Sequence, residues 1–316
     1  MAMTSNLSAT KRPNVKLPSL VTESLAATLP VFEMDRSRLI NGRLIFDRDG
    51  GFNRAISKGF FLIKIPNEID ASVGDVFSRH FFEALRGDAL DSYRGFREIK
   101  MQGDYQGYFD REHDQWENFY IEMSNWNDIL PPDVTRIGHQ MTDLGIAILR
   151  NILSGLKIPI SDWALVTGGL TEKKGHQMLA FNHFRSNKPV RGSKFHRDSG
   201  WVTVLKSTEP GLIALIEDQL WRVNPEPGYF IVNFGSSIEV LTAYLQNPVR
   251  ASIHGVVRTE RIKGTPNRTS YVTFLDSSLS SMIFCYKDGG LVPLQTMAEF
   301  ADQEVSRTYD DDNETL

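Results

Sequence analysis

Two histidines and one aspartate in the second half of the chain have the types and spacing of metal ligands. His196 and Asp198 stand two residues apart in the tripeptide His196-Arg197-Asp198, and His254 follows 56 residues after Asp198. On a strand, residues two apart point to the same face, and an antiparallel neighbour can bring His254 beside them. Two imidazoles and one carboxylate form the facial triad that holds non-haem Fe(II) and leaves positions open for a chelating cosubstrate and O2.

A candidate carboxylate receptor begins fourteen residues after His254. Arg268 and Ser270 open the apolar stretch 271–275 and share one face by the strand period of two. A guanidinium binds a carboxylate through a planar fork, and a hydroxyl can add a further hydrogen bond. A carboxylate receptor beside an open Fe(II) site is what bidentate 2-oxoglutarate requires.

The composition indicates a soluble globular protein. The 316 residues carry 35 Lys and Arg against 39 Asp and Glu, which gives a net charge of −4, and 41% are hydrophobic. A nucleic-acid binder usually has a clear positive excess. No run approaches the ~18 apolar residues of a membrane span, and no signal peptide is recognisable. The one cysteine, Cys285, cannot form an internal disulfide, so we expect a cytoplasmic protein with a buried thiol.

Periodicity predicts the elements that must position these residues. In the first part of the chain we expect strands at 29–34 and 59–65. A helix is predicted at 71–86, because apolar residues recur at four-residue spacing. The clearest helix begins at Pro131-Pro132-Asp133 and ends at Gly155.

After Pro159 the pattern changes to short strands separated by turn residues. Such a pattern favours a sandwich or barrel. No helices alternate with these strands, which excludes a doubly wound parallel sheet. We therefore predict a mainly β fold with α-helices. The predicted strands are 177–184, 200–206, 212–217, 229–234, 237–241, 251–258, 269–275 and 281–286.

At these motifs the sequence resembles the Fe(II)/2-oxoglutarate-dependent dioxygenases of the isopenicillin N synthase-like superfamily. It looks nearest to tailoring oxygenases of the deacetoxycephalosporin-synthase type. The resemblance implies a distorted double-stranded β-helix, or jelly roll, with N-terminal helices packed on it. The resembling segments are 59–65 (GFFLIKI), 93–96 (YRGF), 195–205 (FHRDSGWVTVL), 227–242 (PGYFIVNFGSSIEVLT), 251–257 (ASIHGVV) and 267–275 (NRTSYVTFL).

The expected domain organisation follows from the resemblance and the composition. Residues 20–308 are predicted to form a single oxygenase domain, with a helical and aromatic portion at 20–160 and the jelly-roll core at 161–300. Residues 1–19 are expected to form a flexible arm. Residues 309–316 are expected to form a solvated acidic tail, with folding over the site as an alternative.

The resemblance also implies roles for individual residues. His196, Asp198 and His254 ligate Fe(II), and Arg268 and Ser270 bind the distal carboxylate of 2-oxoglutarate.

One strand departs from the family pattern. Many members have Asn-x-Tyr before the H-x-D tripeptide, where this chain has Asn182-His183-Phe184 and so lacks the tyrosine hydroxyl. We place Asn182 at the cosubstrate. His183 is a candidate substrate contact, and a strand histidine that faces away from the site is the alternative.

Further residues are candidates for contacts with substrate. Tyr120 and Glu122 share one face of the segment 119–123, which resembles a substrate-lining strand of the family; packing against the core is the alternative. Arg94, in the YRGF segment, is a candidate partner for a substrate carboxylate, and a surface arginine is its alternative.

A basic run precedes the metal ligands. Residues 185–197 contain five basic residues, Arg191 among them, and no acidic residue. Because the chain is net acidic, this run is a candidate attractor for an anionic substrate, with Arg191 as a contact. A solvated surface loop is the alternative.

These features together predict a dioxygenase that uses Fe(II), 2-oxoglutarate and O2. The expected reaction is hydroxylation, desaturation or oxidative cyclisation of a small, anionic, amino-acid-derived metabolite in a biosynthetic pathway. The resemblance implies that 2-oxoglutarate is converted to succinate and CO2. We expect a monomer or small homo-oligomer with no nucleic-acid or membrane partner. Three alternatives stay open: a 2-oxoglutarate-independent oxidase of the isopenicillin N synthase kind, a cupin-like metalloprotein without redox chemistry, and a non-catalytic binding protein.

Overall fold

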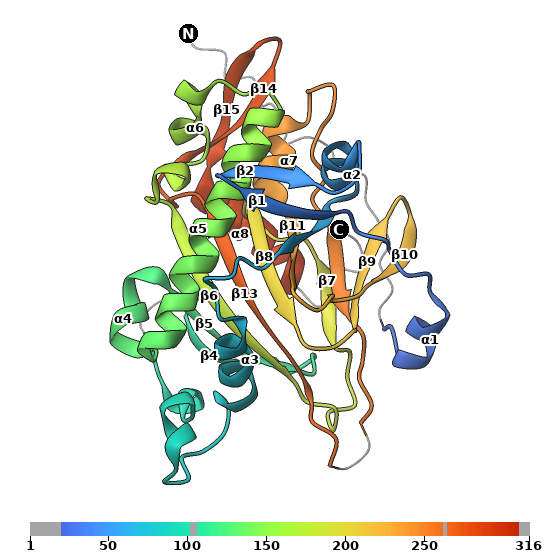
Figure 1. Ribbon diagram of the computed structural model, residues 1–316, viewed down its shortest axis with the longest axis vertical. Coiled ribbons are helices and arrows are strands. Elements are labelled where there is room, and N and C mark those ends of the chain that lie inside the picture. Colours follow the sequence, from blue (N-terminus) through green and yellow to red (C-terminus); the bar gives the residue numbers. More distant parts are fainter. Residues whose placement is uncertain (1–19, 102–105, 262–263, 310–316) are drawn as a thin grey trace.

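A long, mostly antiparallel sheet forms the framework of the molecule. Figure 1 shows the computed structural model, which describes residues 20–101, 106–261 and 264–309. The strands of this larger sheet are β1 Arg36–Ile40, β2 Arg43–Phe46, β3 Phe60–Lys64, β4 Gly107–Asp110, β5 Trp116–Glu122, β6 His176–Phe184, β8 Val202–Ser207, β11 Tyr229–Phe234 and β13 Arg268–Asp276. Their order is β2-β1-β3-β11-β8-β13-β6-β5-β4, and β1 pairs with β3 in parallel.

A smaller sheet lies against one face of the larger one. Its strands are β7 Ser193–His196, β9 Leu212–Ile216, β10 Gln219–Val223 and β12 Ile253–Val256, in the order β10-β9-β12-β7. Residues of both sheets line a common cavity. A separate hairpin is formed by β14 Met282–Lys287 and β15 Gly290–Thr296. The mainly β jelly-roll arrangement expected from the sequence is confirmed.

Helices cover the outer face of the larger sheet. The longest, α5, packs on β8 and β13, and α3 packs on β13 and β6, as Figure 1 shows. Both helices bury apolar faces, as amphipathic helices on a sheet must. The helices are α1 Glu23–Thr28, α2 Gly51–Lys58, α3 Ala71–His80, α4 Trp126–Ile129, α5 Pro132–Gly155, α6 Ile160–Val166, α7 Ser236–Thr242 and α8 Met297–Tyr309; short 3₁₀ helices lie at Ala89–Tyr93, Phe96–Glu98, Met123–Asn125 and Leu170–Glu172.

The N-terminal portion contributes more strand than its sequence suggested. The helix α5 and the strand β3 agree with expectation, and β5 contains most of the strand expected at 119–123, but β1, β2 and β4 also join the larger sheet. The segment 29–34, predicted as a strand, is irregular and pairs with β10 at an isolated bridge between Val31 and Arg222. Pro30 lacks an N–H group, which limits the pairing that this segment can make.

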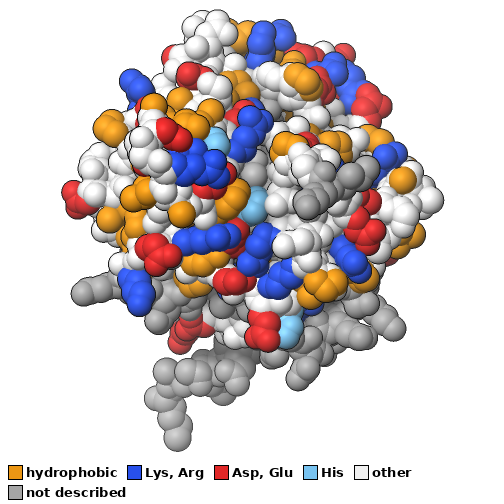
Figure 2. Space-filling model, turned by 90° about the horizontal axis from the view of Figure 1, so that it is seen from below, with side chains coloured by type: hydrophobic (Ala, Val, Ile, Leu, Met, Phe, Trp, Pro, Cys, Tyr) orange, Lys and Arg blue, Asp and Glu red, His pale blue; other side chains and the backbone are white. Residues whose placement is uncertain are grey.

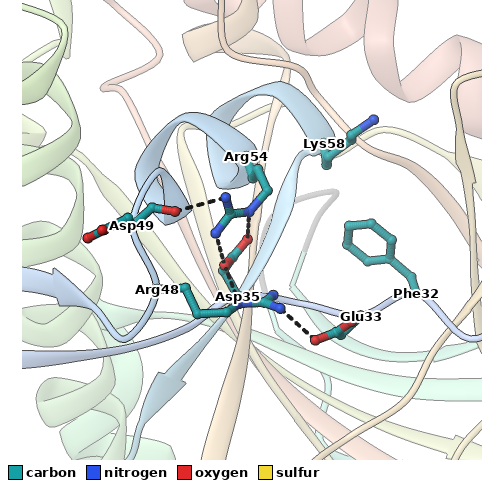
Figure 3. Close-up of a pocket in the computed structure, with 7 residues that line it drawn as sticks. All are labelled: Phe32, Glu33, Asp35, Arg48, Asp49, Arg54 and Lys58. Carbon is teal, nitrogen blue, oxygen red and sulfur yellow. Dashed lines mark hydrogen bonds and ion pairs between the residues drawn. The ribbon is translucent and has the colours of Figure 1, made fainter.

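Charged side chains hold this irregular segment in place. Figure 3 shows that Arg54 binds the carboxylate of Asp35 through two nitrogens, at 2.7 and 2.8 Å, and that Arg48 bridges Asp35 and Glu33. Burial alone raises the pKa of Asp35, but the two arginines outweigh burial and hold it below its ordinary value. The surrounding pocket also includes Lys58, which pairs with a glutamate. Because its charges are matched, we assign this pocket a structural role.

Two further expectations are wrong, one about where a helix ends and one about the type of an element. The helix predicted at 71–86 ends at His80, because the carbonyl of Phe81 accepts a hydrogen bond from Phe96 N. The segment 237–241, predicted as a strand, lies in the helix α7. An apolar run of this length fits either element, and buried Ile238 and Leu241 are three residues apart.

The structure also bears on the expected burial of Cys285 and on the expected absence of a membrane span. Cys285 lies on β14 and is buried, as predicted. Within the described residues, no helix is long and apolar enough to cross a membrane. The expected arm 1–19 lies outside the described residues, and so does the expected tail beyond Tyr309.

Candidate active site

Neighbouring strands of the smaller sheet bring the histidines together. His196 ends β7 and lies directly opposite His254 on β12, and their ring centroids are 4.6 Å apart. Asp198 follows β7 in an irregular turn. Its Oδ1 lies 3.8 Å from Nε2 of each histidine, and ligand atoms of the three residues lie within 4.8 Å of one another. The arrangement fits a facial triad for Fe(II).

Backbone carbonyl groups orient both imidazoles. Nδ1 of His196 lies 2.9 Å from the carbonyl oxygen of Lys194, and Nδ1 of His254 lies 3.1 Å from that of Ser252. A carbonyl can only accept, so each Nδ1 carries the proton and each Nε2 keeps its lone pair for a metal. Burial, together with the neighbouring His254, lowers the pKa of His196 to about 4, which keeps its ring neutral at physiological pH.

The carboxylate of Asp198 is held by two hydrogen bonds to one of its oxygens. Its Oδ2 accepts hydrogen bonds from Thr203 Oγ1 at 2.6 Å and Asn233 Nδ2 at 2.7 Å, which leaves Oδ1 toward the histidines. The first N–H group of α7, on Ser236, binds the carbonyl of Asp198 at 2.7 Å. Burial raises the pKa of Asp198, but both histidines and these hydrogen bonds outweigh burial and lower it.

His196, Asp198 and His254 face a cavity of about 400 Å³ between the sheets. Its floor consists of alternate side chains of β5, β6 and β13, which lie in register across the strands. Its apolar lining is Phe109, Trp116, Tyr120, Met178, Phe184, Leu205, Leu212, Val256, Val272, Phe274, Leu279, Met297 and Ala301. Figure 2 views the molecule from below, where Lys and Arg side chains gather near the middle of the face, around histidine.

Arg268, Ser270 and Asn182 lie together at one end of this floor. Arg268 is 1% exposed, stacks 4.6 Å above the ring of Phe184 and donates from Nε to the Pro210 carbonyl at 3.2 Å. Burial lowers the pKa of Arg268 to about 10, so it stays charged near neutral pH. Asn182 Nδ2 donates to Ser270 Oγ at 3.3 Å.

One nitrogen of this arginine has no protein partner. Among the described residues, Arg268 Nη1 is buried and makes no hydrogen bond. A buried charged donor without a partner is costly, and a carboxylate in the cavity would satisfy it. The distal carboxylate of 2-oxoglutarate has the chemistry that this position requires, so the residues present fit both Fe(II) and the cosubstrate.

Tyr120 and Glu122 also line the cavity, as proposed from the alternation on β5. His183 does not. Its Nδ1 lies 2.6 Å from the buried Glu117, its ring stacks on Phe82 at 3.6 Å, and Asn267 contacts its Nε2. The alternation on β6 turns His183 to the face opposite Asn182, which agrees with the strand histidine facing away from the site.

Arg94 and Arg191 lie outside the residues that line the cavity. Arg94 is buried against carboxylates, at 2.9 Å from Glu83, 2.7 Å from Asp88 and 3.1 Å from Asp91. Its charge is therefore neutralised within the fold, which corrects its assignment to substrate.

Much of the basic run is neutralised as well. Arg191 pairs with Asp114, and Arg185 and Lys188 pair with Asp110. Of the five basic residues in the run, Arg197 is the one that lines the cavity.

Several cavity residues were not found from the sequence. Asp276 and His176 continue the alternate positions of β13 and β6, so the period of two that placed Ser270 also indicated Asp276. Burial raises the pKa of Asp276 to about 6. Met297, Ala301 and Glu304 come from α8 at spacings of four and three, the pattern of one helix face.

Comparison with known proteins agrees with this geometry. Residues 175–277 match the model of the 2OG-Fe(II) oxygenase superfamily. No curated protein matches the chain significantly.

Solved structures resemble the fold at low sequence identity. JOX2, in complex with 2OG, Fe and JA, is 17% identical, with 93% of this chain and 91% of that chain covered and a TM-score of 0.65. The rice dioxygenase for auxin oxidation is 17% identical, with coverages of 87% and 95% and a TM-score of 0.63. A full-length Neurospora crassa protein in complex with alpha-KG and thymine is 16% identical, with coverages of 81% and 88% and a TM-score of 0.61.

Proposed function

We propose that this chain, whose residues 175–277 match the model of the 2OG-Fe(II) oxygenase superfamily, oxidises a C–H bond of a small, carboxylate-bearing, amino-acid-derived metabolite. The enzyme is a dioxygenase whose cofactors are Fe(II) and 2-oxoglutarate. Hydroxylation, desaturation and ring closure are the reaction types that we propose, in a biosynthetic pathway.

One observation carries the proposal. Three ligand atoms converge within 4.8 Å at the same cavity into which a buried, unpartnered guanidinium nitrogen of Arg268 faces. We propose that His196, Asp198 and His254 hold the metal, and that Arg268 and Ser270 hold the distal carboxylate of 2-oxoglutarate. When bound, the metal and cosubstrate together supply the oxidising power for the reaction with O2.

The protein itself positions the metal-binding atoms and excludes water from the cavity. Hydrogen bonds from both Nδ1 atoms to backbone carbonyls, and from Asn233 to Asp198 Oδ2, orient the metal-binding atoms before any ligand arrives. The apolar cavity wall keeps solvent away from the reacting carbon, and α8 covers part of the wall with Met297 and Ala301. Arg197 is our proposed contact for the substrate carboxylate.

We also propose a domain organisation, a cellular compartment and an oligomeric state. We treat residues 20–308 as one oxygenase unit, because strands from both portions of the chain share the larger sheet. We propose a cytoplasmic monomer or small homo-oligomer, since nothing in the composition requires another compartment.

The main rival is an Fe(II) oxidase that needs no 2-oxoglutarate and uses Arg268 and Ser270 for its substrate. Arg268 favours the cosubstrate, because its pocket is narrow: Phe184 covers one face of the guanidinium, and a Cβ on Gly211 would lie 3.0 Å from Nε. A small dicarboxylate suits so enclosed a receptor better than a large substrate.

The test combines a binding and a turnover measurement. Anaerobic Fe(II) and 2-oxoglutarate should together give a weak visible charge-transfer band, and O2 should then produce succinate. His196→Ala should abolish both signals. The variant Asn67→Ala, at an exposed turn, is the control and should retain them. Absence of the band and of succinate, with oxygen uptake that persists without 2-oxoglutarate, would establish the rival.

A further inference from the structure

Asp276 lies at the end of the cavity floor opposite Arg268. Both residues belong to β13, eight positions apart, and face the cavity with Ser270, Val272 and Phe274 between them. Thr203, which holds the metal ligand Asp198, lies opposite Phe274 in the sheet register. The metal ligands therefore lie between a cationic end and an anionic end of the same cavity.

The position of Asp276 is closely defined by its neighbours. Its Oδ1 accepts a hydrogen bond from Ser199 Oγ at 3.2 Å, and a Cβ on Gly200 would lie 2.5 Å from the same oxygen. Asp276 is thus packed against the two residues that follow the ligand Asp198. Its Oδ2 accepts no hydrogen bond from any residue that the structure describes, so an acceptor is available at the cavity.

Neighbouring side chains make this end suited to a cation. His176 lies opposite Asp276 in the register, and its Nδ1 is 3.3 Å from Glu122. Both Glu122 and Asp276 line the cavity. The other end needs an anion, because Arg268 Nη1 is buried without a partner in the described part of the chain. This independent observation assigns 2-oxoglutarate to one end and leaves the other for substrate.

We propose that Asp276, supported by Glu122, receives a protonated amine of the substrate. The substrate class is then an amine-bearing acid, with its ammonium group at Asp276 and its carboxylate at Arg197, which lines the same cavity. The inference rests on the proposed function and adds the residue that selects for the amine. A hydrogen-bonded ion pair in an enclosed cavity is strong enough to discriminate against an analogue that lacks the amine.

The test uses three six-carbon probes that differ in their charged groups. L-Norleucine carries an amine and a carboxylate, hexylamine carries the amine alone, and hexanoate carries the carboxylate alone. Each is titrated calorimetrically into the anaerobic Fe(II) and 2-oxoglutarate complex. In Asp276→Asn, norleucine and hexylamine should bind about tenfold more weakly, as expected for the loss of one charged hydrogen bond, while hexanoate binding stays constant.

A matched control separates this effect from a change in the fold. Asp143→Asn changes an exposed aspartate that pairs with Lys173, and it should change no probe affinity.

The outcomes distinguish the two proposals. If the charge-transfer band forms but Asp276→Asn binds norleucine as tightly as the wild-type protein, the amine assignment is overturned and the proposed function stands. Failure of the wild-type complex to bind either amine probe at millimolar concentration, or an equal loss of amine binding in Asp143→Asn, also overturns the assignment. Absence of the band in the wild-type protein overturns the proposed function itself.

Discussion

Asn233 donates a hydrogen bond of 2.7 Å to Oδ2 of Asp198, the oxygen that points away from the two histidines. Thr203 donates to the same oxygen from the neighbouring strand β8. The carboxylate therefore cannot rotate without breaking two buried hydrogen bonds, and Oδ1 is held where a metal would meet it. The orientation of this carboxylate depends on the larger sheet, although the histidines come from the smaller one.

Loss of the Asn233 side chain should weaken metal binding more than it destabilises the fold. In Asn233→Ala, Asp198 keeps only Thr203 on Oδ2, and we expect affinity for Fe(II) or Co(II) to fall about tenfold or more, as for other partners of metal ligands. Anaerobic titration with Co(II) measures this directly. Asn67→Ala, at an exposed turn, should bind the metal normally. Equal affinities in the two variants would show that Asn233 does not position the ligand.

Replacement of Arg268 by lysine should separate cosubstrate binding from metal binding. Lysine keeps the positive charge but loses the planar fork and the stacking on Phe184. We expect affinity for 2-oxoglutarate to fall about ten- to a hundredfold in Arg268→Lys, with Co(II) affinity unchanged. Calorimetric titration of 2-oxoglutarate into the metal complex is the measurement. The control is Arg38→Lys, which changes an exposed arginine that pairs with Asp47. Unchanged 2-oxoglutarate affinity would remove Arg268 from the cosubstrate site.

The convergence of the three proposed metal ligands, and of Arg268 with Ser270, was predictable because local spacing encodes it. A period of two on β13 places Arg268 and Ser270 on one face, and the tripeptide at 196–198 carries two of the proposed ligands. The pairing of His254 with His196 needed only adjacent antiparallel strands. For these residues, short-range periodicity is enough to indicate the chemistry.

Other features depend on contacts that no local pattern encodes. Arg94 looked like a substrate contact by type, but its three carboxylate partners are brought together only when the chain turns after α3. Asn233 gave no signal by itself, because its role exists only beside Asp198. The early end of α3 likewise follows from a hydrogen bond between Phe81 and Phe96, which depends on the tertiary fold.

Buried Glu117 should make the protein sensitive to acid. It accepts a hydrogen bond from His183 at 2.6 Å, and Arg97 and Tyr108 also donate to it. Burial raises its pKa, but these three partners outweigh burial and lower it to about 2. A group with a lowered pKa stabilises the fold above its unfolded-state pKa, and this contribution is lost as the pH falls from about 4.5 toward 2.

The comparison of Glu117→Gln with the wild-type protein isolates this effect. At pH 7 the variant should be less stable by up to about 3 kcal/mol, and the difference should shrink by pH 3, where the carboxylate is already protonated in the unfolded wild-type chain. Urea unfolding at both pH values provides the free energies. Glu172→Gln changes an exposed pair with Lys174 and should show almost no difference at either pH. A difference for Glu117→Gln that stays constant from pH 7 to pH 3 would contradict the assignment.

Gly138 on α5 marks a place where helix propensity and packing oppose each other. Alanine at an interior helix position gains about 1 kcal/mol over glycine. A Cβ at Gly138, however, would lie 2.6 Å from Leu179 Cδ1 and 2.9 Å from Trp126 Cζ3, and both side chains are fully buried. Overpacking of a close-packed core costs about 1–3 kcal/mol, so we expect Gly138→Ala to be destabilised despite its better propensity. Ala147→Gly on the same helix measures the effect of helix propensity, with an expected loss of about 1 kcal/mol in the free energy of unfolding. Thermal unfolding of both variants shows whether Gly138→Ala lowers or raises the stability. A raised Tm for Gly138→Ala would show that α5 can move away from the sheet at little cost.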